Sequence, residues 1–94
     1  MKKVFVISLG GSLIVPEKMN PKFLIKFVKT LRKHYPKCKF VVVCGGGAIA
    51  RKYISTLREE GKSKKDLAEA GIRATRMNAQ FIMQMFTKKE ANDI

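Results

Sequence analysis

Apolar and polar residues are grouped in blocks along the chain, and these blocks predict an α/β arrangement. Residues 3–9 form a nearly unbroken apolar run, which is typical of a strand buried on both faces of a parallel sheet. Residues 40–44 form a second run of the same kind. Two such strands with a helix between them predict a right-handed strand–helix–strand unit, which is the building block of an α/β layer.

The first predicted helix lies between the two strands. Asn20 and Pro21 supply an N-cap and a proline at the first helical position, and Pro36 ends the helix. Apolar residues then recur at helical spacing, with lysines on the other face. The predicted apolar face consists of Phe23, Leu24, Phe27, Val28 and Leu31.

Two further helices are predicted after the second strand. One stops at Gly61, a natural C-cap, and its predicted buried residues are Ile49, Ala50, Tyr53, Ile54 and Leu57. The other opens at a capping box over residues 63–66, and its predicted face consists of Gly71, Ile72, Thr75, Ala79, Ile82 and Phe86. Two parallel strands alone make a poor sheet, so we expect the chain to be the front part of a longer protein.

Composition limits the chain to one modest core. It has 94 residues, 46% of them hydrophobic, and no apolar run reaches the length of a membrane span, so we expect no membrane partner. Cys38 and Cys44 lie in or beside one strand, without the second pair that a zinc site requires. We interpret them as reduced packing residues of a cytoplasmic protein and assign no metal ligands.

The net charge of +13 has two explanations, a solvated basic surface or a nucleic-acid interface. The basic residues are spread along the chain and do not gather in an arginine–glycine or aromatic-interleaved stretch. Net charge governs non-specific affinity and does not specify a fold. We therefore expect no direct nucleic-acid role, and keep a non-catalytic basic nucleic-acid-binding fragment as the alternative from another functional class.

The candidate chemistry lies in two glycine clusters that directly follow the predicted strands. Gly10, Gly11 and Ser12 follow the first strand, whereas residues 45–47 follow the second strand and lead into a helix. A strand, a glycine turn and a helix N-terminus form an anion site, because free N–H groups point at the ligand and glycine permits close approach. Two such turns predict two phosphate groups, such as a donor and an acceptor.

Two common nucleotide motifs match the chain less well. Residues 61–63 resemble the end of a Walker A loop, but Thr56 occupies the first glycine position and the preceding residues are helical. Gly45, Gly47 and Ala50 fit the dinucleotide fingerprint. That fingerprint requires an acidic residue at the end of the next strand, about 20 residues further on. In this chain the corresponding region, residues 64–66, is the polar start of a predicted helix. The fingerprint also follows the second strand here, which disfavours a dehydrogenase.

Three ordered strings, at residues 9–14, 42–54 and 71–79, resemble the amino acid kinase superfamily. The Gly-Gly-Gly-x-x-Ala-Arg-Lys-Tyr-Ile and Gly-Ile-x-Ala-Thr-Arg-x-Asn-Ala strings most resemble its archaeal-type uridylate (UMP) kinases. The resemblance implies a three-layer parallel-sheet sandwich of the amino acid kinase type, with only its N-terminal part present. Residues 1–94 would be the acceptor-nucleotide-binding part, and the C-terminal ATP-binding part would be absent.

This resemblance also implies an activity. Family members of this type carry out an Mg²⁺-assisted transfer of the ATP γ-phosphoryl group to UMP, giving UDP for pyrimidine nucleotide biosynthesis. We expect the fragment alone to be inactive, and the full-length protein to form a homo-oligomer. The alternatives within the fold are kinases that act on carbamate, an acylated amino acid or an isoprenoid phosphate.

The resemblance assigns the site residues by position. Gly10, Gly11 and Ser12 would approach the transferring phosphoryl group, as the catalytic set. The implied substrate-binding set holds the UMP phosphate by glycine amides and an arginine, with polar residues beside it. It consists of Gly45, Gly46, Gly47, Arg51, Asp66, Thr75 and Asn78.

Two positions depart from the family pattern. Ser8 stands where many members have a lysine that neutralises the transferring phosphoryl group. Ala68 stands where the family usually has an aspartate that binds the nucleoside hydroxyls. Asp66 is close by in the sequence, so a small local shift would supply the missing carboxylate, although a capping role for Asp66 is the competing interpretation.

Overall fold

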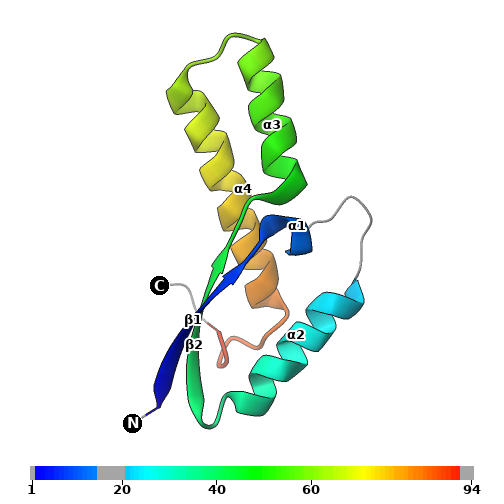
Figure 1. Ribbon diagram of the computed structural model, residues 1–94, viewed down its shortest axis with the longest axis vertical. Helices are drawn as coiled ribbons and strands as arrows, with labels where there is room; N and C mark the ends of the chain where they lie inside the picture. Colours follow the sequence, from blue (N-terminus) through cyan, green and yellow to red (C-terminus); the bar gives the residue numbers. More distant parts are fainter. Residues whose placement is uncertain (1, 15–20, 92–94) are drawn as a thin grey trace.

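The computed structural model describes residues 2–14 and 21–91 and shows two strands and four helices in those ranges (Figure 1). The predicted α/β order is confirmed, with one short helix added after the first strand. The elements in chain order are β1 (Lys3–Leu9), α1 (Gly11–Ile14), α2 (Pro21–His34), β2 (Cys38–Cys44), α3 (Gly47–Glu59) and α4 (Lys64–Gln84). The predicted N-cap residue Asn20 lies outside the described residues.

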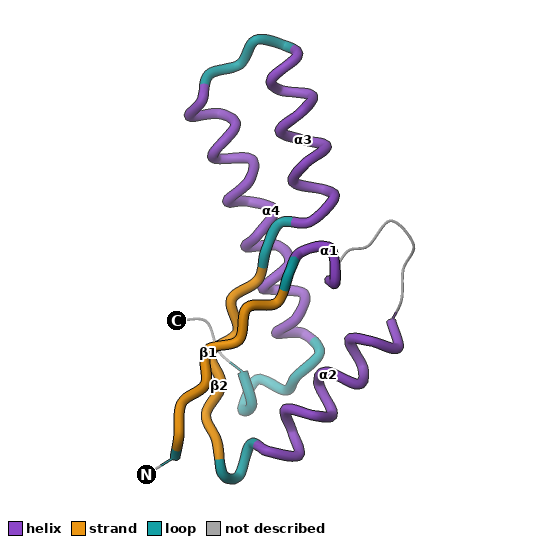
Figure 2. Tube along the Cα trace, viewed as in Figure 1, coloured by secondary structure: helices purple, strands orange, loops and turns teal. Residues whose placement is uncertain are grey.

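The two strands are parallel neighbours, as the strand–helix–strand pattern predicts. Their register runs from Lys3 opposite Cys38 to Leu9 opposite Cys44. Because the strands are parallel and of equal length, both carboxyl ends reach the same edge of the sheet (Figure 2). The two glycine turns that follow them are therefore brought side by side.

The prediction that β1 is buried on both faces is wrong for the described chain. Val4 is 59% exposed and Val6 is 71% exposed, and only Leu9 at the carboxyl end is buried. An apolar run shows that a strand can be covered, but the cover itself must come from other layers of the fold. Within the described residues, β1 is covered only towards its carboxyl end, whereas β2 is partly covered along most of its length.

The core lies at that carboxyl end. Leu9, Ile14, Leu24 and Ile82 form its buried centre, and they come from β1, α1, α2 and α4 respectively. The predicted apolar face of α2 is largely confirmed, because Leu24, Val28 and Leu31 are buried, although Phe23 is 38% exposed. The core thus sits directly beneath the two glycine turns and fixes the elements that carry them.

Helices α3 and α4 form a hairpin that projects beyond the sheet (Figure 1). Gly61 adopts a φ of +74° just after α3, as a C-capping glycine does. Ser63 then caps α4, since its hydroxyl accepts a hydrogen bond from the amide of Asp66 at 3.2 Å and donates one to the Asp66 carboxylate at 3.0 Å. Both boundary predictions are confirmed.

The predicted burial of this hairpin is partly wrong. Tyr53 is 54% exposed and Ile72 is 49% exposed, whereas the buried residues of α4 are Ala74, Asn78 and Ile82. In a projecting hairpin each helix covers only a narrow stripe of the other, so a small rotation exposes side chains at the margin of a predicted face. The buried stripe repeats every four residues and includes a polar side chain.

A bidentate ion pair joins α2 to the turns that follow α4. The Arg32 guanidinium donates to both carboxylate oxygens of Glu90, each at 2.9 Å, and lies 5.7 Å from the Phe86 ring centroid. Glu90 also accepts from the amide of Thr87 at 2.7 Å. The guanidinium, first, and then this amide hold the pKa of Glu90 at about 2, well below its ordinary value.

This lowered pKa predicts a stability loss in acid. The carboxylate of Glu90 stabilises the fold fully above pH 4.5, its ordinary pKa, and that contribution disappears as the pH falls towards about 2. We expect Glu90→Gln to remove this part of the pH dependence of the urea midpoint. Glu59→Gln, at an exposed position without an ion pair among the described residues, is the control and should leave the acid limb unchanged. Identical acid limbs for Glu90→Gln and the unsubstituted chain would contradict the prediction.

Candidate phosphate-binding site

The two glycine turns touch each other through their backbones. The amide of Gly45 donates a 3.0 Å hydrogen bond to the carbonyl of Leu9. A Cβ atom on Gly11 would lie 2.6 Å from the carbonyl carbon of Gly46 and from the Cα atom of Gly47. No side chain fits between the turns, so glycine at these positions is what allows the two backbones to meet.

No side chain caps the N-terminus of α3, where the amide nitrogen of Gly47 packs against Gly11 of the first turn. Gly46 is the N-cap residue, with φ −86° and ψ −28°. Gly47 has a φ of +67°, a conformation that favours glycine. Among the described residues, the structure shows no acceptor for the amides of residues 46–49. Free amides at the positive end of a 13-residue helix suit a phosphate group.

Thr75 and Asn78 of α4 lie against this second turn. Asn78 is only 4% exposed, and its side-chain amide donates to the carbonyl oxygens of Gly45 at 2.8 Å and of Gly46 at 3.2 Å. The Thr75 hydroxyl donates to the Ile72 carbonyl at 2.7 Å within the helix, and its methyl group faces Gly46. The structure thus brings both residues to the turn, while their contact with a substrate stays a prediction.

Ser12 and Arg51 are exposed near the two turns. Ser12 is the second residue of α1, and Arg51 is the fifth residue of α3. No described acidic side chain pairs with Arg51, so its guanidinium is available to an anion near the start of the helix. Gly10 precedes α1, and its carbonyl accepts from the amides of Leu13 and Ile14.

Asp66 is placed apart from the glycine turns. It lies at the start of α4, near the far end of the helical hairpin, and its carboxylate is engaged by the Ser63 hydroxyl (Figure 1). Asn78 is twelve residues further along the helix, which corresponds to about 18 Å. The structure therefore shows the capping interaction and does not bring Asp66 to the site, and its role as a ribose ligand stays a prediction. Ala68 lies two residues further along the same helix and is exposed.

The two cysteines are the first and last residues of β2, and Cys44 packs against the core. Both are free thiols of intermediate exposure, and burial raises the pKa of the Cys44 thiol. Cys44 is therefore neutral beside the second glycine turn and does not oppose a bound anion. In residues 2–14 and 21–91, no group of three or more His, Cys, Asp or Glu side chains is arranged to hold a metal ion.

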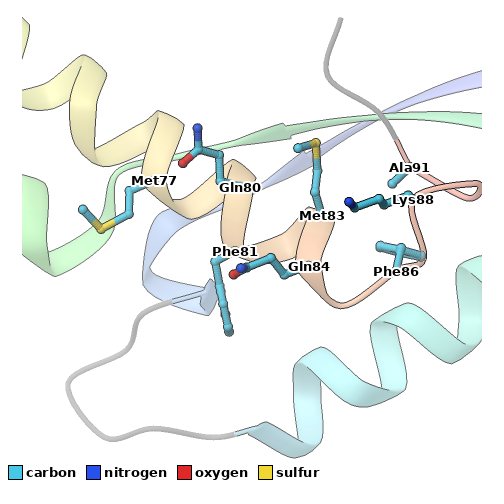
Figure 3. A pocket seen from close by; sticks show the side chains of 8 residues that line it. All are labelled: Met77, Gln80, Phe81, Met83, Gln84, Phe86, Lys88 and Ala91. Carbon is cyan, nitrogen blue, oxygen red and sulfur yellow. The ribbon is translucent and has the colours of Figure 1, made fainter.

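A separate hollow of about 690 Å³ lies along the C-terminal part of α4 and the turns after it (Figure 3). Its lining includes Met77, Phe81, Met83 and Phe86, and Lys88 is the charged side chain among the described residues that line it. None of the glycine-turn residues lines it. This hollow, whose lining also includes Gln80 and Gln84, is distinct from the candidate phosphate site.

Sequence reasoning missed two features of the site. The short helix α1 follows the first glycine pair and contributes Ile14, the most fully buried side chain of the core. Its four residues give too little periodicity to detect. The hydrogen bonds from Asn78 to the second turn depend on how α4 crosses the sheet edge. The one available signal is an asparagine within an otherwise small and apolar helical stripe.

The fold and the paired glycine turns define a class of protein: the chain belongs to the amino acid kinase family. The sequence model of that family matches residues 3–93. The α/β fold of the amino acid kinase type predicted from the sequence is thereby confirmed. In the part of the chain that the structure describes, no helix is both long and apolar enough to span a membrane.

Within that family, the chain is similar to several uridylate kinases. The chain is 43% identical over 94 residues to the uridylate kinase of Thermoplasma volcanium, covering 100% of this chain and 40% of the relative. It is 41% identical over 83 residues to that of Methanoculleus marisnigri, covering 88% and 35%. It superposes on the crystal structure of uridylate kinase from Archaeoglobus fulgidus with a TM-score of 0.75 and 38% identity, covering 87% and 36%. The chain thus spans less than half the length of these relatives.

Proposed function

We propose that the chain forms the acceptor-phosphate site of a uridylate kinase, an enzyme that transfers the γ-phosphoryl group of ATP to UMP. One observation carries the proposal: two parallel strands end in glycine turns that touch, at the N-terminus of a helix bearing Arg51. The proposal is also supported by the sequence identity of this chain to two uridylate kinases, which is 41% and 43%.

The site suits phosphoryl transfer because that reaction depends on positioning and charge neutralisation more than on covalent chemistry. The amides of residues 46–49 would bind oxygens of the UMP phosphate, and Arg51 would neutralise its charge. Gly10, Gly11 and Ser12, on the adjoining turn, would face the phosphoryl group in transfer. The adjacent turns would hold the two anions next to each other, which in-line transfer requires.

The donor side of the reaction lies largely beyond these residues. ATP and Mg²⁺ are the partners that a kinase of this family implies. The described residues contain no carboxylate cluster suited to Mg²⁺, so we derive no step through the metal ion. We propose that ATP and Mg²⁺ bind to the part of the enzyme that the relatives have in addition. Residues 1–94 would then be the N-terminal, acceptor-binding part.

Partners and location follow as secondary proposals. The exposed apolar side chains Met77 and Phe81 on α4 support assembly of the full-length protein into a homo-oligomer. The free thiols of Cys38 and Cys44 suit the reducing cytoplasm. Neither a membrane nor a nucleic acid is part of the proposed function.

Arg51→Ala tests the phosphate site directly. We expect the affinity of the chain for UMP to fall about 10- to 100-fold, since a charge-assisted hydrogen-bond pair is lost, while the urea midpoint stays the same. Binding of UMP, uridine and inorganic phosphate is followed by titration of the backbone amide resonances. Lys52→Ala removes a neighbouring exposed cation and is the matched control, with an expected change below twofold.

Each result separates the proposal from its rivals. The proposal is supported if the chain binds UMP, if Arg51→Ala weakens this binding while Lys52→Ala does not, and if uridine binds weakly. These results together would indicate a phosphate site for a nucleotide. Unchanged UMP affinity in Arg51→Ala contradicts the assignment. Binding of RNA that falls steeply with salt and is insensitive to Arg51→Ala would instead indicate the basic nucleic-acid-binding alternative.

A further inference from the structure

We propose that Asn78 is a positioning residue that aims the amides of the second glycine turn at the acceptor phosphate and does not itself contact the nucleotide. The inference rests on the proposed function and deepens it. It reassigns a residue that the family resemblance places in the substrate-binding set. Three observations carry it: the burial of Asn78, the two hydrogen bonds that it donates, and the geometry of the peptide units that receive them.

Burial removes Asn78 from direct contact with a nucleotide. It is only 4% exposed, and its neighbours four residues away on the same stripe, Ala74 and Ile82, are also buried. A buried amide is costly unless it is hydrogen-bonded. Its side-chain nitrogen has two protons, and these meet two acceptors, the carbonyls of Gly45 at 2.8 Å and Gly46 at 3.2 Å. The donor capacity of Asn78 is therefore fully used inside the protein.

The two acceptors determine where the neighbouring amides point. A trans peptide unit is planar, so its C=O and N–H groups point in opposite directions. The Gly45 carbonyl shares its peptide unit with the Gly46 amide, and the Gly46 carbonyl shares its unit with the Gly47 amide. When Asn78 holds both carbonyls towards α4, the amides of Gly46 and Gly47 point away from α4.

Glycine makes this anchoring necessary. Residues 45–47 have no side chains to restrict their backbone, and such a turn visits several conformations unless it is held. The Gly47 conformation, with a φ of +67°, presents its amide only while the preceding peptide unit is fixed. Asn78 supplies that restraint from a helix packed into the core through Ile82. The turn is thus preorganised by a buried residue whose side-chain nitrogen is engaged within the protein.

Asn78→Asp replaces the donating amide group with a carboxylate of nearly the same shape. A carboxylate cannot donate to the two carbonyls and repels them, so the turn loses its anchor. We expect the affinity for UMP to fall at least tenfold and the amide resonances of Gly46 and Gly47 to shift in the ligand-free chain. Gln80→Glu makes the same charge change at an exposed position of α4 and should alter UMP affinity less than twofold.

The measurements are UMP and inorganic phosphate titrations followed by amide resonances, with folding checked by circular dichroism and urea. If Asn78→Asp does not fold, Asn78→Ser retains one donor and takes its place, with an expected three- to tenfold loss. UMP affinity within twofold of the unsubstituted chain in a folded variant overturns the inference. If Arg51→Ala still lowers the UMP affinity about 10- to 100-fold in that case, the proposed function stands. An unsubstituted chain that binds neither UMP nor phosphate overturns both.

Discussion

Gly11→Ala is expected to lower the free energy of unfolding by about 3 kcal/mol, at the upper end of overpacking effects, and to abolish UMP binding. The added Cβ would lie 2.6 Å from the carbonyl carbon of Gly46 and from the Cα atom of Gly47. Both are backbone atoms, which cannot rotate away as a flexible side chain does. The two turns must therefore move apart, and the amides of the second turn move with them.

Gly10→Ala is the matched control for this substitution. A Cβ on Gly10 would meet no heavy atom within 4 Å, and its φ is not positive. The unfolding free energy should change by less than about 1 kcal/mol. Urea denaturation of both variants compares the two positions. Equal stability losses at Gly10 and Gly11 would show that the contact between the turns contributes little.

The same pair separates packing from chemistry. The role of Gly10 beside the transferring phosphoryl group rests on resemblance alone. The unfolding free energy of the chain is expected to change little when Gly10 is replaced by alanine. A full-length enzyme with Gly10→Ala that folds normally but transfers phosphoryl groups slowly would support that assignment. Gly11, in contrast, is required by a contact that the structure shows directly.

Features governed by local rules could be predicted from the sequence. The glycine turns after two apolar runs, the cap at Ser63 and the left-handed Gly61 each depend on residues within a few positions. The adjacency of the two turns also follows, because parallel neighbours end at one edge of a sheet. These rules were enough to place the candidate site.

Features that depend on distant packing could not be predicted. The exposure of Val6 and Ile72 depends on which layers cover them, and an apolar pattern specifies only that cover is tolerated. Arg32 and Glu90 are 58 residues apart and nothing in their spacing pairs them. The sequence predicts that Asn78 lies on a helix face beside the site, but its burial and its bond to the Gly45 carbonyl depend on how α4 crosses the sheet edge.

Asp66 has two competing interpretations, a helix cap and a ribose ligand, and the structure shows the cap. Its carboxylate is two residues from Ala68, so a local shift would be needed for it to replace the family aspartate, and the capping role competes with that use. On a helix, a two-residue offset turns the side chain by about 200°, so the two positions face different directions. The Ser63 hydroxyl also holds the carboxylate in its cap. Sequence distance along a helix is thus a poor guide to a shared ligand.

Gly47→Ala is the second substitution with a large expected effect, and it combines two costs. Alanine at a φ of +67° is unfavourable by about 1 kcal/mol. A Cβ there would also lie 2.5 Å from the Gly11 carbonyl oxygen, which adds about 2 kcal/mol of overpacking. We expect a total loss of about 3 kcal/mol in the unfolding free energy, with loss of UMP binding.

Gly61→Ala isolates the conformational part of this effect. Gly61 has a similar φ of +74°, but a Cβ on it would meet nothing within 4 Å. Gly61→Ala should lower the unfolding free energy by about 1 kcal/mol and leave the UMP affinity unchanged. The difference between the two variants in urea denaturation then measures the contact between the turns. Equal losses at Gly47 and Gly61 would mean that backbone conformation alone requires glycine, and that the two turns are held together by their strands.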